Sequence, residues 1–330
     1  MLNFLRNRWF LIALVVLSSS GLTIGIQLSK EEAESFSSLI NPRWITAFVL
    51  FLMAFSLDSR QLKASVRSPG PVLWASLVNY VVIPVLALCL VRWQSPDDFK
   101  YGLMIAASVP CTLAGASVWT RRAGGNDAVS LLVTLLTNAV CFLAAPFWLS
   151  QFASEDVQLN SRDMVFRLFL VVLIPTIIGQ GLRQIVKLET VATQFKSTIS
   201  VVAQSLILVL VLAATIKAGP RLNATGFNPG LAAVVLIWST CIAIHLTAMF
   251  IGVAGALAFG FSRTDCAAVA FASSQKTLPI GIVLADEFAN LGFTFALFPI
   301  LMYHFSQIFI DTLIADRLAS GMRSEAGLPS

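Results

Sequence analysis

Long apolar runs recur along this chain at short intervals, and they restrict its fold more than any other feature. A helix needs about 20 apolar residues to cross about 30 Å of hydrocarbon. Ten runs approach or exceed that length and predict membrane-spanning helices at residues 9–28, 42–57, 70–91, 101–121, 127–150, 164–182, 198–217, 231–259, 265–286 and 292–314. We therefore predict an all-α polytopic membrane protein with ten transmembrane helices.

The composition agrees with a protein that lies in a lipid bilayer. Of 330 residues, 57% are hydrophobic and 12% are charged, whereas about 25% of the residues of a soluble domain carry a charge. The net charge of +5 comes from Lys and Arg residues between apolar runs. No basic cluster alternates with aromatic residues, so we expect no nucleic acid as a partner.

Positive charges predict the orientation. The first run follows Arg6 and Arg8 but is too long for a signal peptide, so we expect a retained first helix. With the N-terminus inside, 13 Lys and Arg residues fall on inner segments and eight on outer ones. Because basic residues favour cytoplasmic loops, we expect an integral protein of the inner or plasma membrane with both termini in the cytoplasm.

Proline and polar residues interrupt two predicted helices. Pro110 lies in the fourth helix and Pro279 in the ninth, 169 positions apart, which is close to half of the chain. Five helices in each half, 1–162 and 163–330, would place the second half upside down in the membrane. Two inverted repeats with paired broken helices are typical of secondary transporters, which bind their ligands at the breaks. The alternative is a coincidence of two helix kinks.

The two breaks are rich in oxygen-bearing groups. Proline has no N–H, so Pro110 and Pro279 predict free carbonyls at Ala106 and Gln275. These oxygens suit a hard cation such as sodium, and the N-termini of the following half-helices suit an anionic substrate group. The side chains that we place near the breaks are Thr112, Ser117, Ser274, Gln275 and Thr277.

Two further polar sets leave alternatives open. Ser130, Thr134, Thr137 and Asn138 follow i, i+4, i+7, i+8 spacing on the fifth helix and so share one face. They can ligate a cation or join neighbouring helices by hydrogen bonds. The same two interpretations apply to Asn79 in the third helix.

Lys276 is the basic residue that no loop explains. It lies in the middle of the ninth predicted helix, and no other charge stands between Asp265 and Asp286. A charge at that depth costs at least about 2.5–3.5 kcal/mol on insertion scales, so it indicates a functional site. A lysine that reaches a water-filled cavity or a salt-bridge partner is the alternative.

The remaining polar residues have simpler interpretations. His245 and His304 are too far apart for a zinc motif, and each is expected to form a hydrogen bond with a neighbouring helix. Acidic residues near the predicted span ends are interpreted as interfacial charges: Asp58, Asp286, Glu287 and Asp311. No paired aspartates, Ser/His pair or metal motif points to an enzyme, and we expect no cofactor other than bound sodium ions.

Three stretches of the chain carry a family resemblance: Thr120-Arg121-Arg122-Ala123-Gly124-Gly125-Asn126-Asp127-Ala128, Phe271-Ala272-Ser273-Ser274-Gln275-Lys276-Thr277-Leu278-Pro279-Ile280-Gly281 and Leu301-Met302-Tyr303-His304-Phe305-Ser306-Gln307-Ile308. With them, nearly the whole chain resembles the bile acid:sodium symporter family, in particular its cotransporter-7-like branch. The resemblance implies two inverted five-helix repeats, a panel of helices 1, 2, 6 and 7, and a core of helices 3, 4, 5, 8, 9 and 10. Helices 4 and 9 would cross at their breaks.

The resemblance also implies a sodium site, from which this chain departs. Carried over, the cation ligands fall on Asn79, Ser117, Ser130, Thr134 and residues 272–277. Sodium-coupled members have a glutamate and a glutamine where this chain has Ala272 and Lys276. Two positive charges about 4 Å apart repel by about 4 kcal/mol at an effective dielectric of 20. We hypothesise that the Lys276 ammonium replaces one sodium or carries a proton during transport.

These observations predict a secondary transporter of a small organic anion that works by alternating access and is coupled to a cation. The residues predicted to contact the substrate are Pro110, Thr112, Asn138, Lys276 and Pro279. Proton-coupled transport or uniport through the same fold is one alternative. A regulator of membrane ion homeostasis that does not transport is the other. The sequence predicts neither the substrate nor the oligomeric state.

Overall fold

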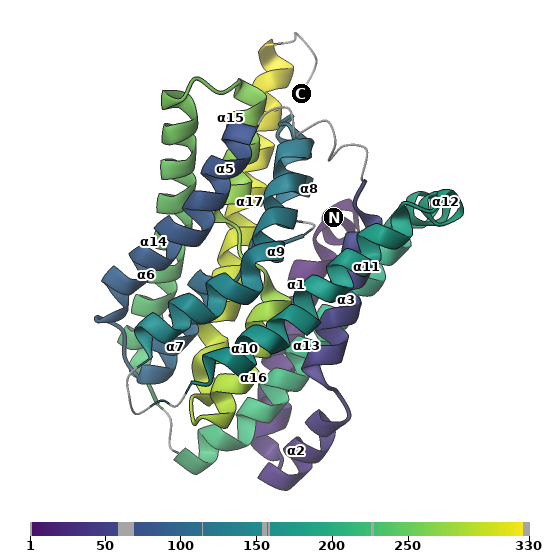
Figure 1. The fold of residues 1–330 in the computed structure, drawn as a ribbon. Coiled ribbons are helices and arrows are strands. Elements are labelled where there is room, and N and C mark those ends of the chain that lie inside the picture. The colour runs from purple at the N-terminus through teal and green to yellow at the C-terminus, as the bar shows by residue number, and fades with distance from the viewer. Residues whose placement is uncertain are drawn as a thin grey trace.

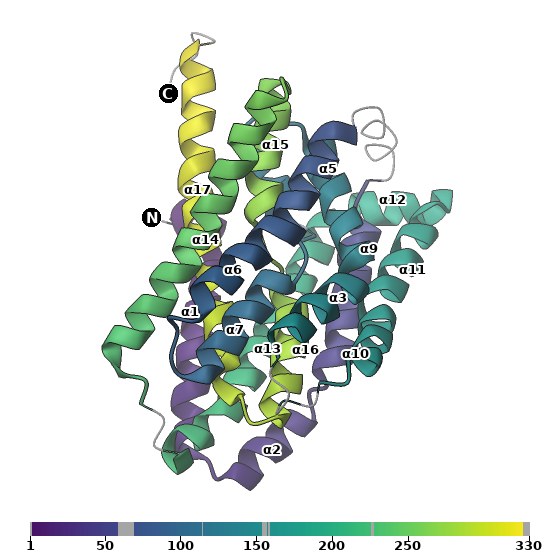
Figure 2. The same ribbon diagram turned by 60° about the vertical axis from the view of Figure 1, so that its left-hand side comes forward.

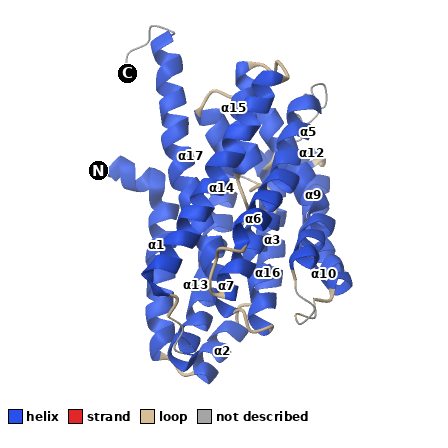
Figure 3. Ribbon diagram, turned by 90° about the vertical axis from the view of Figure 1, so that its left-hand side faces the viewer, coloured by secondary structure: helices blue, strands red, loops and turns tan. Residues whose placement is uncertain are grey.

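The computed structural model describes residues 2–58, 69–113, 115–153, 157, 159–225 and 228–325, in which all regular structure is helical (Figure 3). Arg60, Lys63 and Arg67, which contribute to the predicted orientation, lie outside these residues. Within them, nine helices are long and apolar enough to cross a membrane. The remaining predicted span is the fourth, which consists of two short helices. The prediction of an all-α polytopic membrane protein is confirmed.

The helices follow the predicted spans closely. In chain order they are α1 (Leu2–Gln27), α2 (Lys30–Ser38), α3 (Pro42–Ser56), α5 (Pro69–Leu77), η1 (Val78–Val82), α6 (Ile83–Val91), α7 (Asp97–Ser108), α8 (Gly115–Arg122), α9 (Asp127–Phe152), α10 (Ser161–Leu168), η2 (Phe169–Leu173), α11 (Ile174–Arg183), α12 (Val186–Gln194), α13 (Lys196–Thr225), α14 (Gly230–Ala258), α15 (Arg263–Ser274), α16 (Leu278–Asn290), η3 (Thr294–Ala296) and α17 (Leu297–Glu325).

The sequence analysis missed two short helices, α2 and α12. Helix α2 begins with a capping box, in which Ser29 accepts from the Glu32 N–H and the Glu32 carboxylate accepts from the Ser29 N–H. It ends shortly before Asn41, which caps α3, and Pro42 occupies the start of α3, where a missing N–H costs nothing. Both helices lie at the ends of longer ones and leave the membrane-spanning order unchanged (Figures 1 and 2).

Four membrane-spanning segments form the panel that the resemblance implies: α1, α3, α13 and the segment made of α10, η2 and α11. Helix α1 packs along α13, and α3 packs against both α11 and α13 (Figure 1). Glycine permits the close contact between α1 and α13, because a Cβ built at Gly219 would lie 2.3 Å from the carbonyl carbon of Gly25. We use "panel" for α1, α3, α10, α11 and α13.

The core consists of the other long helices. Helix α14 packs against α15 and α17, α15 packs against α5 and α9, and α7 packs against α6 and α17. Together α5 and α6, joined by the π-helical turn η1, form the third predicted span. The surface where the panel meets the core, called the seam below, runs between α3 and α13 on one side and α16 on the other.

The fourth and ninth helices cross at their breaks, as predicted. Helices α7 and α15 each have 12 residues and each end before an extended residue, Val109 (ψ 156°) and Gln275 (ψ 146°). The Thr277 N–H donates to the Pro110 carbonyl at 2.9 Å, so the two breaks are joined by a backbone hydrogen bond.

The prediction that Pro110 and Pro279 occupy matching positions in the two breaks, however, is wrong. The half-helices α7 and α15 start at 97 and 263 and end at 108 and 274, an offset of 166 rather than 169. At that offset Pro110 corresponds to Lys276. Pro279 instead lies in the first turn of α16, a favoured position for proline. The ninth helix is therefore interrupted at Gln275, before its proline is reached.

Candidate functional site

The Lys276 ammonium lies in a cage of carbonyl oxygens at the crossover. Its Nζ donates to Asn79 O at 2.8 Å, to Asn79 Oδ1 at 3.1 Å and to Val109 O at 2.9 Å. Lys276 is only 2% exposed. The Tyr80 ring centroid lies 5.4 Å from Nζ, within cation–π range. Because an ammonium has three donors, these three oxygens use all of its hydrogen bonds.

Local backbone structure makes these oxygens available. Asn79 lies in the π-helical turn η1, where the Ile83 N–H donates to the Val78 carbonyl five residues earlier. The next residue, Pro84, has no N–H to offer to Asn79 O in the same pattern. Val109 O is free because α7 ends there. The Asn79 side chain also donates to Gln275 O at 2.9 Å, so Asn79 is both a ligand of the ammonium and a partner of the break.

Helix α17 holds the ninth-helix break with three residues spaced four apart. The Tyr303 hydroxyl donates to Ser274 O at 2.9 Å. The Gln307 side chain accepts from the Lys276 N–H and donates to the Lys276 carbonyl, both at 2.8 Å. Asp311 Oδ2 accepts from Gln275 Nε2 at 2.6 Å. One face of α17 therefore holds all three residues of the break, 274, 275 and 276.

Asp311 is not an interfacial charge, and that interpretation was wrong. It is fully buried, because α17 continues to Glu325, well past the predicted span end at 314. Its Oδ1 lies 2.9 Å from His245 Nε2, and His245 Nδ1 lies 3.2 Å from Ser274 O. The predicted hydrogen bond between His245 and a neighbouring helix is present. His304 contacts Gln307 on its own helix and also forms a hydrogen bond with the backbone of Lys276 at the break.

The polar face of α9 holds the fourth-helix break in a similar way. Thr137 Oγ1 accepts from the Cys111 N–H at 3.3 Å, and Asn138 Nδ2 donates to Cys111 O at 2.9 Å. Ser130 shares a 2.6 Å hydrogen bond with Thr120 of α8. Both residues of each pair are buried. The helix-joining interpretation therefore describes three of the four residues, whereas Thr134 bonds to its own helix.

The predicted cation-binding residues fall into two groups. Asn79, Ser274, Gln275, Lys276 and Thr277 lie at or beside the crossover. Ser117 of α8 instead donates to Asp127 at the start of α9, and Ser130 and Thr134 lie on the same helix as Asp127. The structure thus places a carboxylate beside Ser117, although position 272, where sodium-coupled members have a glutamate, holds an alanine.

A cavity of about 290 Å³ reaches the crossover from one end of the seam. Thr112, Gln275, Thr277 and Pro279 line its inner wall. Residues of α1, α3 and α13 line the panel side. The N-terminus of α16 opens into this cavity, and the Thr277 side chain makes no capping hydrogen bond there. Four of the residues predicted at the breaks therefore line one cavity between panel and core.

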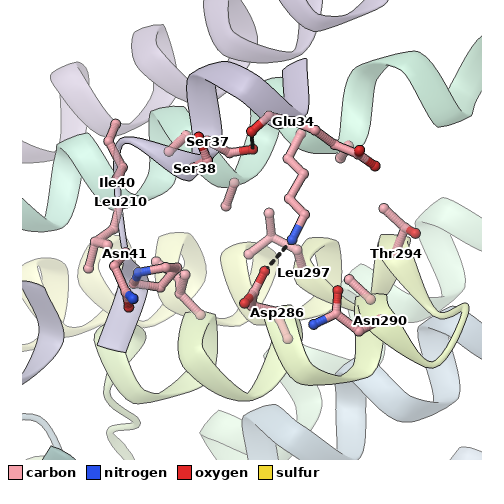
Figure 4. Close-up of a pocket in the computed structure, with 18 of the residues that line it drawn as sticks. Glu34, Ser37, Ser38, Ile40, Asn41, Leu210, Asp286, Asn290, Thr294 and Leu297 are labelled. Atoms are coloured by element: carbon pink, nitrogen blue, oxygen red, sulfur yellow. Dashed lines mark hydrogen bonds and ion pairs between the residues drawn. The ribbon is translucent and has the colours of Figure 1, made fainter. Parts of the chain in front are cut away.

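A second cavity, of about 370 Å³, lies at the opposite end of the seam beside α2 (Figure 4). Lys217 of α13 pairs with Asp286 of α16 across it at 2.5 Å. Glu287 pairs with Arg167 of α10 at 3.2 Å and with Arg43 of α3 at 3.7 Å. Asp286 and Glu287 are thus not merely interfacial charges, because both join the core to the panel.

Sequence reasoning missed Tyr303, Gln307, His245 and Asp311 as parts of this site. The spacing of Tyr303, Gln307 and Asp311 at i, i+4 and i+8 in an apolar helix was a usable signal. Nothing in the sequence showed that this face is turned toward the break. The backbone oxygens of Asn79 and Val109 could not be identified from side chains.

Comparisons with known proteins show which family the chain belongs to. The model of the SBF-like CPA transporter family matches residues 8–320. The chain is 23% identical to sodium/bile acid cotransporter 7 of Rattus norvegicus over 339 residues, with 98% of this chain and 96% of the relative covered. It is 27% identical to the probable sodium/metabolite cotransporter BASS4, chloroplastic, of Arabidopsis thaliana over 283 residues, with 82% and 64% covered.

The chain thus spans somewhat less than two thirds of the plant relative and nearly the full length of the animal one. A protein of Pseudomonas aeruginosa without an assigned function is 23% identical over 286 residues, with 84% of each chain covered. These matches confirm the resemblance to the bile acid:sodium symporter family, and their names describe transporters rather than enzymes. The chain belongs to the SBF-like CPA transporter family.

Proposed function

We propose that the protein is a secondary transporter of an organic anion, in which the core moves against the panel and exposes the crossover to each side of the membrane in turn. Two cavities at opposite ends of the seam support this proposal, because alternating access needs space between panel and core toward each side, and one of the cavities reaches the crossover. The names of the relatives support coupling to sodium. The same proposal includes two further features: both termini lie in the cytoplasm, and residues 1–162 and 163–330 form two inverted repeats. The matching 12-residue half-helices favour the repeats.

The observation that carries the proposal is the oxygen cage around Lys276. Three carbonyl oxygens lie 2.8–3.1 Å from the Lys276 Nζ, and a hard cation would bind oxygens of the same kind. In our proposal the ammonium is a resident cation that replaces one transported sodium. Its charge stabilises the crossover permanently, and repulsion of about 4 kcal/mol at about 4 Å would keep a sodium ion from the adjacent position.

The substrate would bind in the crossover cavity. The first turn of α16 offers N–H groups and the positive end of a 13-residue helix, which suit a carboxylate or a similar anion. Thr112 and Pro279 border this position, whereas Pro110 and Asn138 support it from behind. For a transported sodium ion we propose Ser117, Ser130 and Thr134, together with the Asp127 carboxylate that Ser117 contacts.

Substitution of Lys276 tests this proposal. A stability screen of purified protein against organic anions, with and without sodium, would identify a substrate for uptake measurements in liposomes. In Lys276→Gln an uncharged side chain leaves the oxygen cage free for sodium. We expect a steeper dependence of uptake on sodium and one more positive charge moved per substrate. Lys100→Gln removes a positive charge that pairs with Asp97 near the start of α7 and serves as the control.

Unchanged sodium dependence and unchanged charge movement in Lys276→Gln would contradict the role of the lysine. Uptake driven by a proton gradient without sodium would favour the proton-coupled alternative. A purified protein that binds anions but moves none across the liposome membrane would favour a regulator that does not transport.

A further inference from the structure

Within the described chain, one buried amide at the crossover forms a hydrogen bond through its NH₂ group but not through its oxygen. Gln275 is 1% exposed, and its Nε2 donates to Asp311. Its Oε1 is buried and has no hydrogen-bond partner among the residues that the structure describes. Buried polar atoms are nearly always paired, so an unpaired one in a native site calls for an explanation by a ligand or a function.

Asp311 fixes which end of the amide faces the cavity. A carboxylate oxygen accepts hydrogen bonds, so it selects the NH₂ group of Gln275 and turns Oε1 away from itself. His245 holds the other carboxylate oxygen at 2.9 Å, so Asp311 cannot turn freely. Both residues are fully buried. The orientation of the Gln275 amide is therefore set by its surroundings.

The unpaired oxygen points toward Gly115 at the wall of the crossover cavity. A Cβ built at Gly115 would lie 2.9 Å from Gln275 Oε1 and 2.8 Å from Thr112 Cγ2. All three residues line the cavity, together with Thr277 and Leu278 at the start of α16. The oxygen thus lies beside the helix terminus that we propose for the anionic group of the substrate.

A donor group fits this oxygen better than a cation. Hard cations such as calcium and magnesium gather about six or more oxygens. The backbone oxygens nearest along the chain already have partners, because Ser274 O accepts from Tyr303 and Gln275 O accepts from Asn79. A single amide oxygen at a cavity wall suits one N–H or O–H group.

We propose that Gln275 Oε1 accepts a hydrogen bond from the transported anion, so that the substrate carries a hydroxyl or amino group near its anionic group. Asp311 acts as the positioning residue for that acceptor. This inference rests on the proposed transport of an organic anion and narrows the substrate to hydroxy acids, amino acids or similar compounds.

Matched carboxylates that differ by one hydroxyl group test the inference. The probes are lactate with propionate, malate with succinate, and 2-hydroxyhexanoate with hexanoate, with affinities measured from the thermal stabilisation of the purified full-length protein. For each pair that binds, we expect the hydroxylated compound to bind at least about tenfold more tightly, because the compound without the hydroxyl group leaves a buried acceptor unpaired. In Gln275→Leu that ratio should fall toward one.

Three further variants separate the role of this oxygen from general damage to the cavity. Gln204→Leu removes another amide from the same cavity, on the panel side, and should keep the preference for the hydroxyl group. Gly115→Ala should reduce the preference because its methyl group would crowd Oε1. Asp311→Asn can present either an oxygen or an NH₂ group to Gln275, so it should weaken the preference while carboxylates still bind.

The possible results distinguish the two proposals. Equal affinities within every pair, or a preference that survives in Gln275→Leu, would overturn the role of Gln275 and leave anion transport standing. If none of the six carboxylates stabilises the protein, the inference is overturned, whereas anion transport is decided by the wider screen of organic anions. A sodium affinity that falls in Gln275→Leu without any change in the preference would assign the oxygen to sodium instead.

Discussion

The two ends of the seam hold panel and core together in different ways. At the α2 end, Lys217, Arg167 and Arg43 of the panel form ion pairs with Asp286 and Glu287 of α16. At the crossover end, the ion pairs of Arg121 with Asp127 and of Arg122 with Asp316 stay within the core. A 3.4 Å hydrogen bond from Thr46 to Pro279 O crosses the seam near the crossover.

This difference indicates which end is held closed by charge. Ion pairs across a seam resist separation of the two sides, and partly buried ones are screened less by salt than exposed ones. The crossover end instead presents a helix terminus and several uncharged polar groups to its cavity, and the charged residue of its lining, Arg122, pairs with Asp316 of the core. Among the described residues, the ion pairs between panel and core are therefore concentrated at the α2 end, whereas the cavity at the other end reaches the crossover.

The largest expected effect comes from a change in the panel behind the ion pairs. In Gly219→Ala the new methyl group would meet the backbone of Gly25 at 2.3 Å, so α13, which carries Lys217, must move from α1. Added groups in a tightly packed contact cost about 1–3 kcal/mol or more. We expect a lower thermal unfolding midpoint in detergent.

Gly181→Ala is the matched control, because a Cβ there would meet nothing within 4 Å. Equal midpoints for the two variants would show that the contact between α1 and α13 does not restrict the position of α13.

A smaller effect is expected when the acidic partners are neutralised. The double variant Asp286→Asn, Glu287→Gln removes three ion pairs across the seam at about 0.2–1 kcal/mol each. A total of about 0.6–3 kcal/mol changes a conformational equilibrium by about 3–150-fold. Electron–electron distances between spin labels at the exposed positions Leu39 and Leu291 should become longer and more broadly distributed.

Asp97→Asn provides the comparison for this variant, because it removes an acid whose ion pair with Lys100 stays near the start of α7. If that change broadens the label distances as much as the double variant does, the ion pairs do not fasten the α2 end.

The smallest effect should distinguish the two arginines that share Glu287. Arg167 donates a hydrogen bond at 3.2 Å, whereas the Arg43 contact is 3.7 Å long, and both side chains are 40% exposed. We expect Arg43→Gln to change the label distances less than Arg167→Gln does, near the lower end of about 0.2–1 kcal/mol for exposed pairs. The reverse order would place the fastening contact on α3 rather than on α10.

The sequence predicted the helices well because the bilayer imposes a local rule. The length and polarity of each run are readable without knowledge of the fold, and the predicted spans 70–91 and 231–259 agree with Pro69–Val91 and Gly230–Ala258 to within one residue. Lys276 was recognised for the same reason, since a charge within an apolar run is visible locally. Helices α2 and α12 were missed because they are too short to give a signal of that kind.

The partners of the site residues needed the three-dimensional arrangement. Asp311 lies near the end of its predicted span, and only the packing of α17 against α14 shows that it is buried beside His245. The pairing of Pro110 with Pro279 was wrong because sequence distance does not show which residue ends a helix and which begins one.

The sequence by itself therefore determined a polytopic helical membrane protein with two broken helices and one basic residue at membrane depth. Hydrophobicity acts on each segment separately, so a single segment reveals it. Only the tertiary structure decided that the Lys276 ammonium is held by the backbone of the third and fourth helices, and that Gln275 keeps one oxygen without a partner in the described part of the chain. Hydrogen bonds between distant segments depend on backbone geometry, which side-chain patterns do not record.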